Sequence, residues 1–185
     1  MTPVSLVDYG FDPDYQAVYD TAWRYARERL HPLAARMDRE DWFPETEFRA
    51  MADAGLLGVT VPTVYGGAGM SVLAQCFICE AVSYWNHAIG ASLLASDNLC
   101  LDNLVRNANE EQKARYLPRF CDGSAIGALG MTEPGAGSDA LGSMATTARR
   151  DGDAYVLDGR KLFITNGPVA DVLLVYAKTA PEKKQ

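Results

Sequence analysis

A ten-residue segment, GMTEPGAGSD at 130–139, combines residue types that could bind a flat ligand. Three of its residues are glycines, which let a ligand approach the bare backbone, and Thr132 and Ser138 add hydroxyl groups. A second polar segment, FITNG at 163–167, adds an aromatic ring and Thr165. Two such edges could hold a planar heteroaromatic ring, with backbone and hydroxyl groups at its rim. A flavin fits, although the residues alone do not choose it over other planar ligands.

Two familiar phosphate-binding loops do not match this segment. A P-loop needs a lysine after its second glycine, and GAGSD has none. A dinucleotide-binding fingerprint needs a third glycine followed by a helix, whereas Ala140 stands at that position and strands are predicted to follow. An isolated GAGSD would form only a polar turn. The two acids of the segment, Glu133 and Asp139, are predicted to stabilise that turn rather than to act as a catalytic base.

The first two-thirds of the chain is predicted to be helical. Asp12-Pro13 is a typical helix start, and apolar residues recur at three- and four-residue steps as far as His31-Pro32, where the helix should end or kink. Asn109 with Gln112 resembles a capping box that opens a short helix ending near Leu117-Pro118. The other predicted helices span residues 44–55, 71–84 and 87–107, and an extended segment covers 56–70.

The remaining third is predicted to be β structure. Strands are expected from residue 125, over 144–150 and 154–157 as a hairpin at Asp151-Gly152, over KLFIT, and over DVLLVYAK. Helices followed by strands indicate an α+β protein. We therefore predict an all-α amino-terminal helical domain at 1–122 and an antiparallel β domain at 123–185. About four strands leave open edges, so the β domain is predicted to be incomplete.

Composition and charge exclude several functional classes. With 48% hydrophobic residues, the 185-residue chain can bury a substantial core. A net charge of −7 disfavours nucleic acid, and no apolar run reaches the ~20 residues that a membrane span needs. The sequence has no secretion signal, so a cytoplasmic location is predicted. Cys76 and Cys79 form a C-x-x-C, but no ligand set completes a metal site, and we expect reduced thiols packed as small hydrophobes.

Several long motifs resemble one protein family. GALGMTEPGAGSD at 127–139 resembles the flavin loop of the acyl-CoA dehydrogenases, and GRKLFITNGPVADVLLVYAKT at 159–179 resembles their following flavin-contacting strand. Upstream, residues 61–71 and 107–128 resemble the family's helical domain. The likeness covers nearly all of residues 10–179, with the motifs in the family's order, and is greatest to the isovaleryl-CoA dehydrogenases.

The resemblance implies a fold and an activity. Members of the family have an amino-terminal helical domain, a middle β domain and a carboxy-terminal helical domain, commonly assembled as tetramers. They use FAD to dehydrogenate an acyl-CoA to enoyl-CoA, here expected to be short or branched, and an electron-transferring flavoprotein usually reoxidises the FAD. The carboxy-terminal domain, absent from this chain, carries their catalytic glutamate. The base is therefore expected beyond Gln185, and the 185-residue chain alone is expected to be inactive.

The resemblance also implies roles for individual residues. Thr132 would contact the pyrimidine end of the flavin, and Thr165 would hydrogen-bond flavin N5. Ser138 would also bind substrate, close to the CoA thioester arm. Phe163, with Ile164, would cover the ring, although the family usually has tryptophan where Phe163 stands; phenylalanine keeps a flat apolar cover and loses the indole N–H. The full set of implied flavin-binding residues is Leu129, Met131, Thr132, Gly137, Ser138, Phe163, Ile164 and Thr165.

Two alternatives to a dehydrogenase stay open on the same residues. The first is a flavin-dependent monooxygenase or oxidase with the same fold, in which reduced flavin reacts with oxygen. The second is a non-catalytic subunit that completes a partner's flavin site. The assembly is expected to be a homotetramer or a complex with a completing chain. Some members carry paired acids at the base of the acyl pocket, where this chain has Glu80-Ala81; a structural role is as well supported for Glu80 as a substrate contact, so the size of the pocket stays open.

Overall fold

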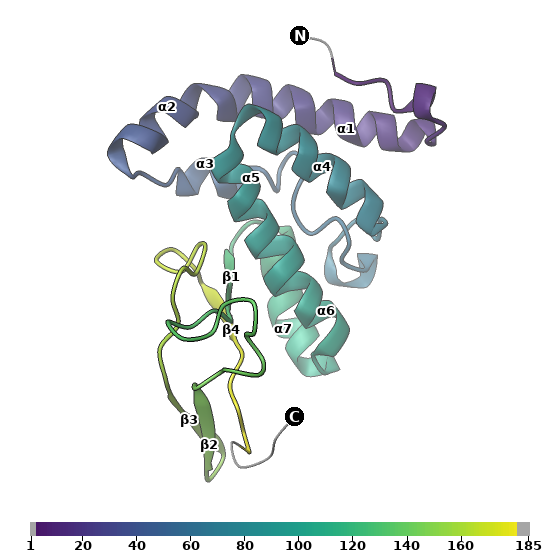
Figure 1. Cartoon of the computed structure of the whole chain (residues 1–185). Coiled ribbons are helices and arrows are strands. Elements are labelled where there is room, and N and C mark those ends of the chain that lie inside the picture. Colours follow the sequence, from purple (N-terminus) through teal and green to yellow (C-terminus); the bar gives the residue numbers. More distant parts are fainter. Residues whose placement is uncertain (1–2, 181–185) are drawn as a thin grey trace.

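The computed structural model describes residues 3–180, which form a helical part followed by a smaller part that contains the strands (Figure 1). The α-helices are α1 Pro13–Tyr25, α2 His31–Glu40, α3 Glu45–Ala50, α4 Val72–Trp85, α5 His87–Leu93, α6 Asp102–Asn107 and α7 Glu110–Cys121. Two π-helical segments, η2 Ala26–Leu30 and η4 Leu94–Leu101, continue α1 into α2 and α5 into α6. Short 3-10 turns cover Val7–Tyr9 and Thr63–Tyr65. The prediction of an α+β protein with its helices first is confirmed.

The helix starts follow the capping residues of the sequence. The Asp12 side chain accepts a hydrogen bond from the Asp14 backbone N–H at 2.9 Å, which satisfies one of the free donors of the first turn of α1. Asn109 and Gln112 form the predicted capping box of α7, each side chain accepting from the other residue's backbone N–H. Local sequence therefore places both helix starts.

Two prolines affect the helices differently from what their positions predict. Pro32 ends no helix: it lies in the first turn of α2, directly after η2, so the expected kink takes the form of a π-helical segment. The predicted end of α7 near Leu117-Pro118 is wrong, because α7 continues through Pro118 to Cys121. A proline this close to the carboxyl end removes a backbone hydrogen bond, but Leu117 and Phe120 are both buried and hold the last turn against the core.

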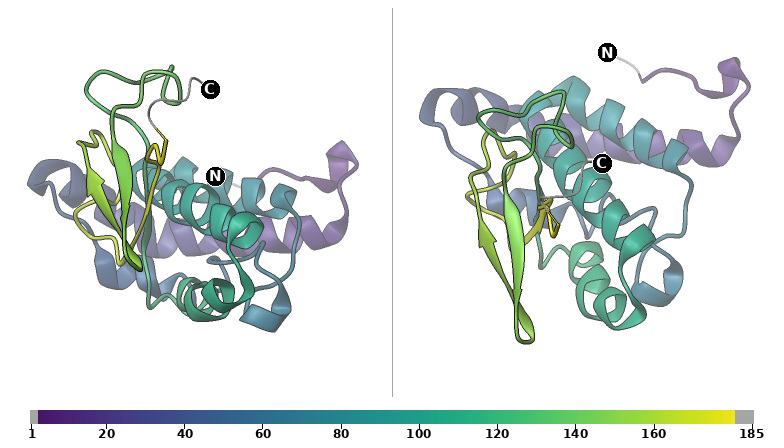
Figure 2. Two further views of the ribbon diagram at one scale, coloured as in Figure 1. Left: turned by 90° about the horizontal axis from the view of Figure 1, so that it is seen from below. Right: turned by 60° about the horizontal axis from the view of Figure 1, so that its bottom comes forward.

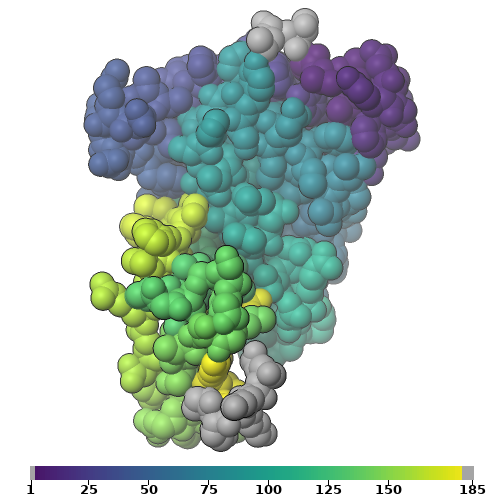
Figure 3. Space-filling model, in the orientation of Figure 1, coloured from purple at the N-terminus to yellow at the C-terminus, as the bar shows by residue number. Residues whose placement is uncertain are grey.

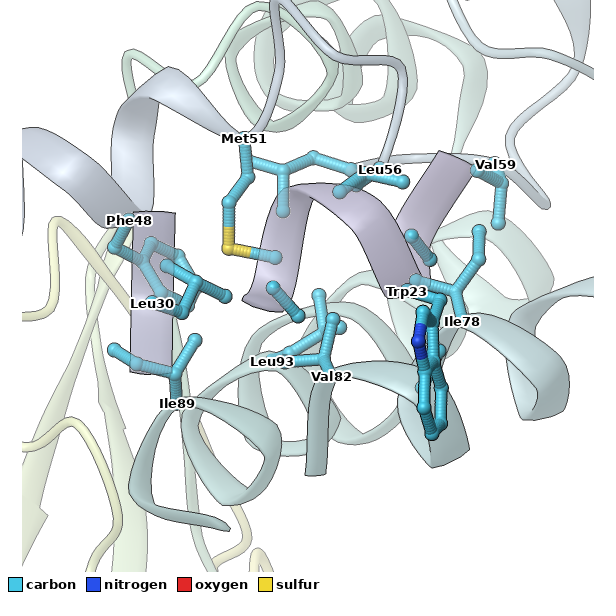
Figure 4. Close-up of a cluster of buried hydrophobic side chains, with 14 of the residues drawn as sticks. Trp23, Leu30, Phe48, Met51, Leu56, Val59, Ile78, Val82, Ile89 and Leu93 are labelled. Atoms are coloured by element: carbon cyan, nitrogen blue, oxygen red, sulfur yellow. The ribbon is translucent and has the colours of Figure 1, made fainter. Parts of the chain in front are cut away.

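The main hydrophobic core lies between α1 and the helices that follow it (Figure 4). Trp23 and Leu30 on the first helix meet Ile78 and Val82 on α4 and Leu93 on α5, all of them buried. Residues 56–70, predicted to be extended, instead form a series of turns over this core, and Leu56 and Val59 from the segment are buried in it. Positive φ values at Gly58, Gly66 and Gly69 explain why the chain turns rather than extends.

The strands form two separate two-stranded sheets. Strand β1 Gly127–Gly130 pairs in parallel with β4 Val172–Val175, and β2 Thr147–Asp151 pairs antiparallel with β3 Ala154–Asp158. The predicted hairpin is confirmed, with Gly152 at φ +61° in its turn (Figure 2). The prediction of a wholly antiparallel β domain is wrong, because β1 and β4 run in the same direction. A parallel pair needs a long crossover, and here residues 131–171 supply it.

The strand part packs directly on the helices (Figure 3). Val172 and Leu174 of β4 contact a second buried cluster that includes Cys100 of η4 and Phe120 of α7. The approach at Gly127 is so close that a Cβ built there would lie 2.7 Å from Phe120 Cε1 and 2.8 Å from Cys100 Cβ. Only glycine lets β1 lie this near η4.

The cysteines only partly follow their prediction. All four are free thiols; Cys100 is buried and Cys79 half-buried, but Cys76, also expected to pack inside, is exposed on α4. Burial raises the pKa of the Cys79 and Cys100 thiols to about 11. Among residues 3–180, no group of three or more His, Cys, Asp and Glu side chains could hold a metal ion. Within the same range no helix is both long and apolar enough to cross a membrane.

Candidate functional site

The structure brings the two sequence segments of the predicted site together. The loop that contains Thr132 follows β1, and the Leu162 N–H, one residue before Phe163, donates to the Thr132 carbonyl at 2.9 Å. The Tyr176 N–H donates to the Gly130 carbonyl at 3.0 Å and fixes the base of the same loop. Segments about thirty residues apart in the sequence therefore share one edge of the molecule, as the sequence predicts.

The first segment leaves β1 through a tight polar turn. Glu133 and Ala136 exchange backbone hydrogen bonds of 3.0 and 3.1 Å across Pro134-Gly135, and Gly137 and Ser138 follow in exposed positions. Thr132 is half-buried at the start of the turn. A Cβ at Gly137 would meet no atom within 4 Å, and φ there is not positive. Glycine at 137 is therefore not required by the described chain itself.

Glu133 has the structural role that the sequence predicts. Its carboxylate accepts hydrogen bonds from the backbone N–H groups of Ala145 and Thr146 at 2.6 and 3.0 Å and from Lys161 Nζ at 2.8 Å. The Lys161 ammonium, helped by these other donors, lowers the pKa of the Glu133 carboxyl to about 2. A carboxylate held this firmly in its ionised form does not suit a general base. The second acid of the loop, Asp139, accepts from both the Ser143 N–H and the Ser143 hydroxyl.

The second segment is a turn and not the strand that KLFIT predicts. The Gly167 N–H donates to the Ile164 carbonyl at 2.9 Å, and Phe163 has a positive φ of 56°, which phenylalanine rarely adopts. The Phe163 side chain is 86% exposed, Thr165 is exposed, and Ile164 is half-buried. Tertiary hydrogen bonds override the strand propensity of these residues, because both ends of the segment are tied to other parts of the chain.

Asn166 is one of those ties, and sequence reasoning missed it. It is buried with φ +65°, and its side-chain amide donates to the Ser92 carbonyl of α5 at 2.9 Å and to the Gly127 carbonyl of β1 at 3.0 Å. An asparagine tolerates the left-handed conformation better than most residues. The Asn166-Gly167 dipeptide is a turn signal that could have revealed it.

The π-helical segment η4 supplies further anchors that the sequence does not reveal. The Gly127 N–H donates to Ser96 Oγ at 3.1 Å, and the Gly58 N–H donates to Asp97 Oδ2 at 2.7 Å. Asp97 is only 4% exposed, and burial raises the pKa of its carboxyl to about 7 despite the Gly58 hydrogen bond. Extra π-helical turns often occur near functional sites, and this one positions the start of β1.

Several polar and aromatic side chains at this edge have no partner within the chain. Within residues 3–180, the hydroxyls of Thr132, Ser138 and Thr165 make no hydrogen bond, and the Phe163 ring packs against no other ring. Free hydroxyls can address the rim of a heteroaromatic ring, and an exposed aromatic ring can cover its face. A groove of about 610 Å³ lies between α2 and α5 and is lined by Trp42 and Trp85, among others, but by none of the predicted site residues.

Comparison with protein families identifies both parts of the chain. Residues 12–124 match the model "Acyl-CoA dehydrogenase, N-terminal domain", and residues 128–185 match "Acyl-CoA dehydrogenase, middle domain". The mitochondrial isovaleryl-CoA dehydrogenase of Pongo abelii is 41% identical over 181 residues, which cover 97% of this chain and 43% of that protein. The chain thus spans less than half the length of the curated relatives it matches.

Solved structures agree with this match. The chain is 32% identical, with a TM-score of 0.86, to a glutaryl-CoA dehydrogenase from Mycobacterium smegmatis in complex with FADH2. The match covers 92% of this chain and 44% of that one. It is 36% identical, with a TM-score of 0.89, to a chain in a structure of the electron transferring flavoprotein of Acidaminococcus fermentans, over 93% of this chain and 45% of that one. The glutaryl-CoA dehydrogenase neighbour was solved with FADH2 bound.

Proposed function

Since this chain belongs to the acyl-CoA dehydrogenase family, we propose that it forms the amino-terminal and middle part of an FAD-dependent dehydrogenase of short or branched acyl-CoA thioesters. The carrying observation is the pair of joined edges, on which Thr132, Ser138 and Thr165 keep free hydroxyls and Phe163 keeps an exposed ring. The isovaleryl-CoA dehydrogenase relatives support a branched substrate.

The proposed flavin contacts follow from this edge. Thr132 would hold the pyrimidine end of the ring system, the Thr165 hydroxyl would donate to N5, and Phe163 with Ile164 would cover one face and exclude water. Leu129, Met131 and Gly137 would complete the lining, and Ser138 would also lie near the thioester arm of the substrate. FAD, when bound, supplies the group that accepts a hydride from the acyl chain.

The proposed partners and organisation rest on the same family. An electron-transferring flavoprotein is proposed as the acceptor of electrons, supported by the likeness to a chain in such a structure, and a homotetramer is proposed as the assembly. We propose domains at 1–122 and 123–185, which the two family matches at 12–124 and 128–185 support. The cytoplasmic location stays a prediction, since several relatives are named as mitochondrial; cell fractionation separates the two locations.

Two measurements test the function. The first is binding of FAD to the 185-residue chain, followed by quenching of flavin fluorescence; saturable binding is expected, and failure to bind without a second protein would favour a subunit that completes a partner's site. The second is anaerobic bleaching of flavin absorbance when isovaleryl-CoA is mixed with the protein purified from its natural host. Bleaching supports the dehydrogenase, whereas absent bleaching with rapid oxygen consumption by the reduced flavin would indicate a monooxygenase or oxidase.

A further inference from the structure

One ion pair lies where the two edges of the proposed flavin site meet. Lys161 Nζ lies 2.8 Å from Glu133 Oε1, and the two side chains are only 12% and 4% exposed. In every other ion pair found within residues 3–180, at least one partner is more than 30% exposed. A buried pair persists only when its remaining donors and acceptors are satisfied, so its other contacts decide what it does.

Those other contacts reach two further stretches of chain. Lys161 Nζ also donates to the Met131 carbonyl at 3.0 Å, one residue before Thr132. Glu133 accepts from the backbone N–H groups of Ala145 and Thr146, which directly precede β2. The pair therefore ties the start of the flavin loop, the residues before β2 and the residues just before the second segment to one point.

The pair is adjacent to the proposed contacts without being one of them. Thr132 lies between the two loop residues that Lys161 binds, and Phe163 follows Lys161 by two residues. The backbone hydrogen bond from Leu162 to the Thr132 carbonyl lies beside the pair. With a neutral side chain at 161, that single backbone bond would remain to hold the edges together here, and Glu133 would keep a nearly buried charge without its counter-ion.

We propose that Lys161 and Glu133 are positioning residues that fix the spacing between the two edges of the flavin site, and that tight FAD binding depends on this spacing. The inference rests on the proposed function, because it assumes that the edges hold a flavin. It adds a role for two residues that would not touch the ring. Their action is indirect, through the placement of Thr132 on one edge and Phe163 and Thr165 on the other.

The test compares Lys161→Met and Lys161→Arg with a matched control in the 185-residue chain. The control is Lys113→Met, which removes a lysine from an ion pair of 3.0 Å with Glu110 on α7, where Glu110 is 79% exposed. Two quantities are measured: the dissociation constant for FAD, and the hydrogen-exchange rate of the Leu162 amide. Lys161→Met should weaken FAD binding by about tenfold or more, since a charge-assisted hydrogen bond is lost beside a buried partner. It should also speed exchange at Leu162.

The other variants keep the test decisive. Lys161→Arg retains the charge and should stay closer to the wild type in both measurements than Lys161→Met, while Lys113→Met should match the wild type. Exchange at the core amide of Ile89 reports whether Lys161→Met is still folded. If it is not, Lys161→Arg alone decides, and a loss of FAD affinity of about tenfold or more in Lys161→Arg overturns the inference. Wild-type affinity and unchanged Leu162 exchange in a folded Lys161→Met also overturn it. If the wild type itself binds no FAD, the proposal that this chain forms the flavin site without a second protein fails, while the Leu162 exchange rate still tests whether the pair fixes the spacing between the two edges.

Discussion

The buried carboxyl of Asp97 should make the stability of the chain depend on pH in an unusual direction. Its pKa is raised from the ordinary value of 3.8 to about 7 by burial on η4. Between these values the folded protein binds a proton that the unfolded chain has released, so stability falls as pH rises through this window. The loss begins near pH 4 and levels off above pH 7. Most acids that gain a partner on folding act in the opposite sense.

The magnitude follows from the two pKa values. A shift of about three pH units corresponds to about 4 kcal/mol in total, of which about 3 kcal/mol falls between pH 4.5 and 8. The neighbouring thiols Cys79, Cys100 and Cys121 do not obscure this change, because burial raises the pKa of each to about 11 and keeps it neutral over the range. Of these four side chains, the Asp97 carboxyl is therefore the one that changes its protonation between about pH 4.5 and 8.

Urea unfolding of the wild type and Asp97→Asn at pH values from about 4.5 to 8 measures this effect. The amide can still accept from the Gly58 N–H but cannot ionise, so the variant should gain about 3 kcal/mol relative to the wild type from the acid to the alkaline end. Asp38→Asn, at an exposed aspartate on α2, is the control and should follow the wild type. Parallel stability curves for Asp97→Asn and the wild type would refute the argument that the buried carboxyl titrates in this range.

Three further predictions concern the flavin site. Thr165→Val should weaken FAD binding or shift the flavin potential more than Thr147→Val on β2, at a cost on the order of 1 kcal/mol for one hydrogen bond; equal affinities and potentials, measured by fluorescence titration and dye equilibration, would contradict the N5 contact. Gly137→Val should leave the unfolding midpoint unchanged, since its side chain meets open space, yet lower FAD occupancy by absorbance; full occupancy would make the loop only a turn. Lys161→Met should raise the pKa of Glu133 from about 2. As pH falls from about 4.5 toward 2, the unfolded wild-type chain takes up a proton that folded Glu133 does not, so the wild type should lose stability over this range and the variant should lose less; identical acid unfolding curves would contradict this.

The sequence predicts what is set locally and misses what depends on distant contacts. The Asp12 and Asn109 caps, and the hairpin around Gly152, each depend on a few neighbouring residues, and all three are confirmed. By contrast, the parallel pairing of β1 with β4 joins residues about 45 apart, and no periodicity in either strand specifies direction. Strand orientation is decided by how both strands pack on the helices.

The candidate site divides in the same way. Glycines and hydroxyls identify the loop at 130–139, and an aromatic ring with a threonine identifies its partner segment at 163–167. Neither indicates that the second segment is a turn, because its shape is imposed by the Asn166 bonds to Ser92 and Gly127, which lie 74 and 39 residues away. The role of Asp97 is equally invisible, since an isolated aspartate in a helical pattern gives no sign of burial. Whether the site residues contact a flavin stays a prediction.

The contact of Arg49 with the strand part has a consequence for the order of folding. Its guanidinium donates to the Gly123 carbonyl at 3.0 Å and to Asp171 Oδ2 at 2.9 Å, the latter across 122 residues of sequence. Asp171 in turn accepts from the Ile126 N–H at the start of β1. Contacts between such distant residues form slowly, because a long loop must close first. On a ribosome the helices would emerge and pack together before β4 is synthesised. Arg49 would therefore already lie on the surface of the packed helices when Asp171 is synthesised and β4 pairs with β1.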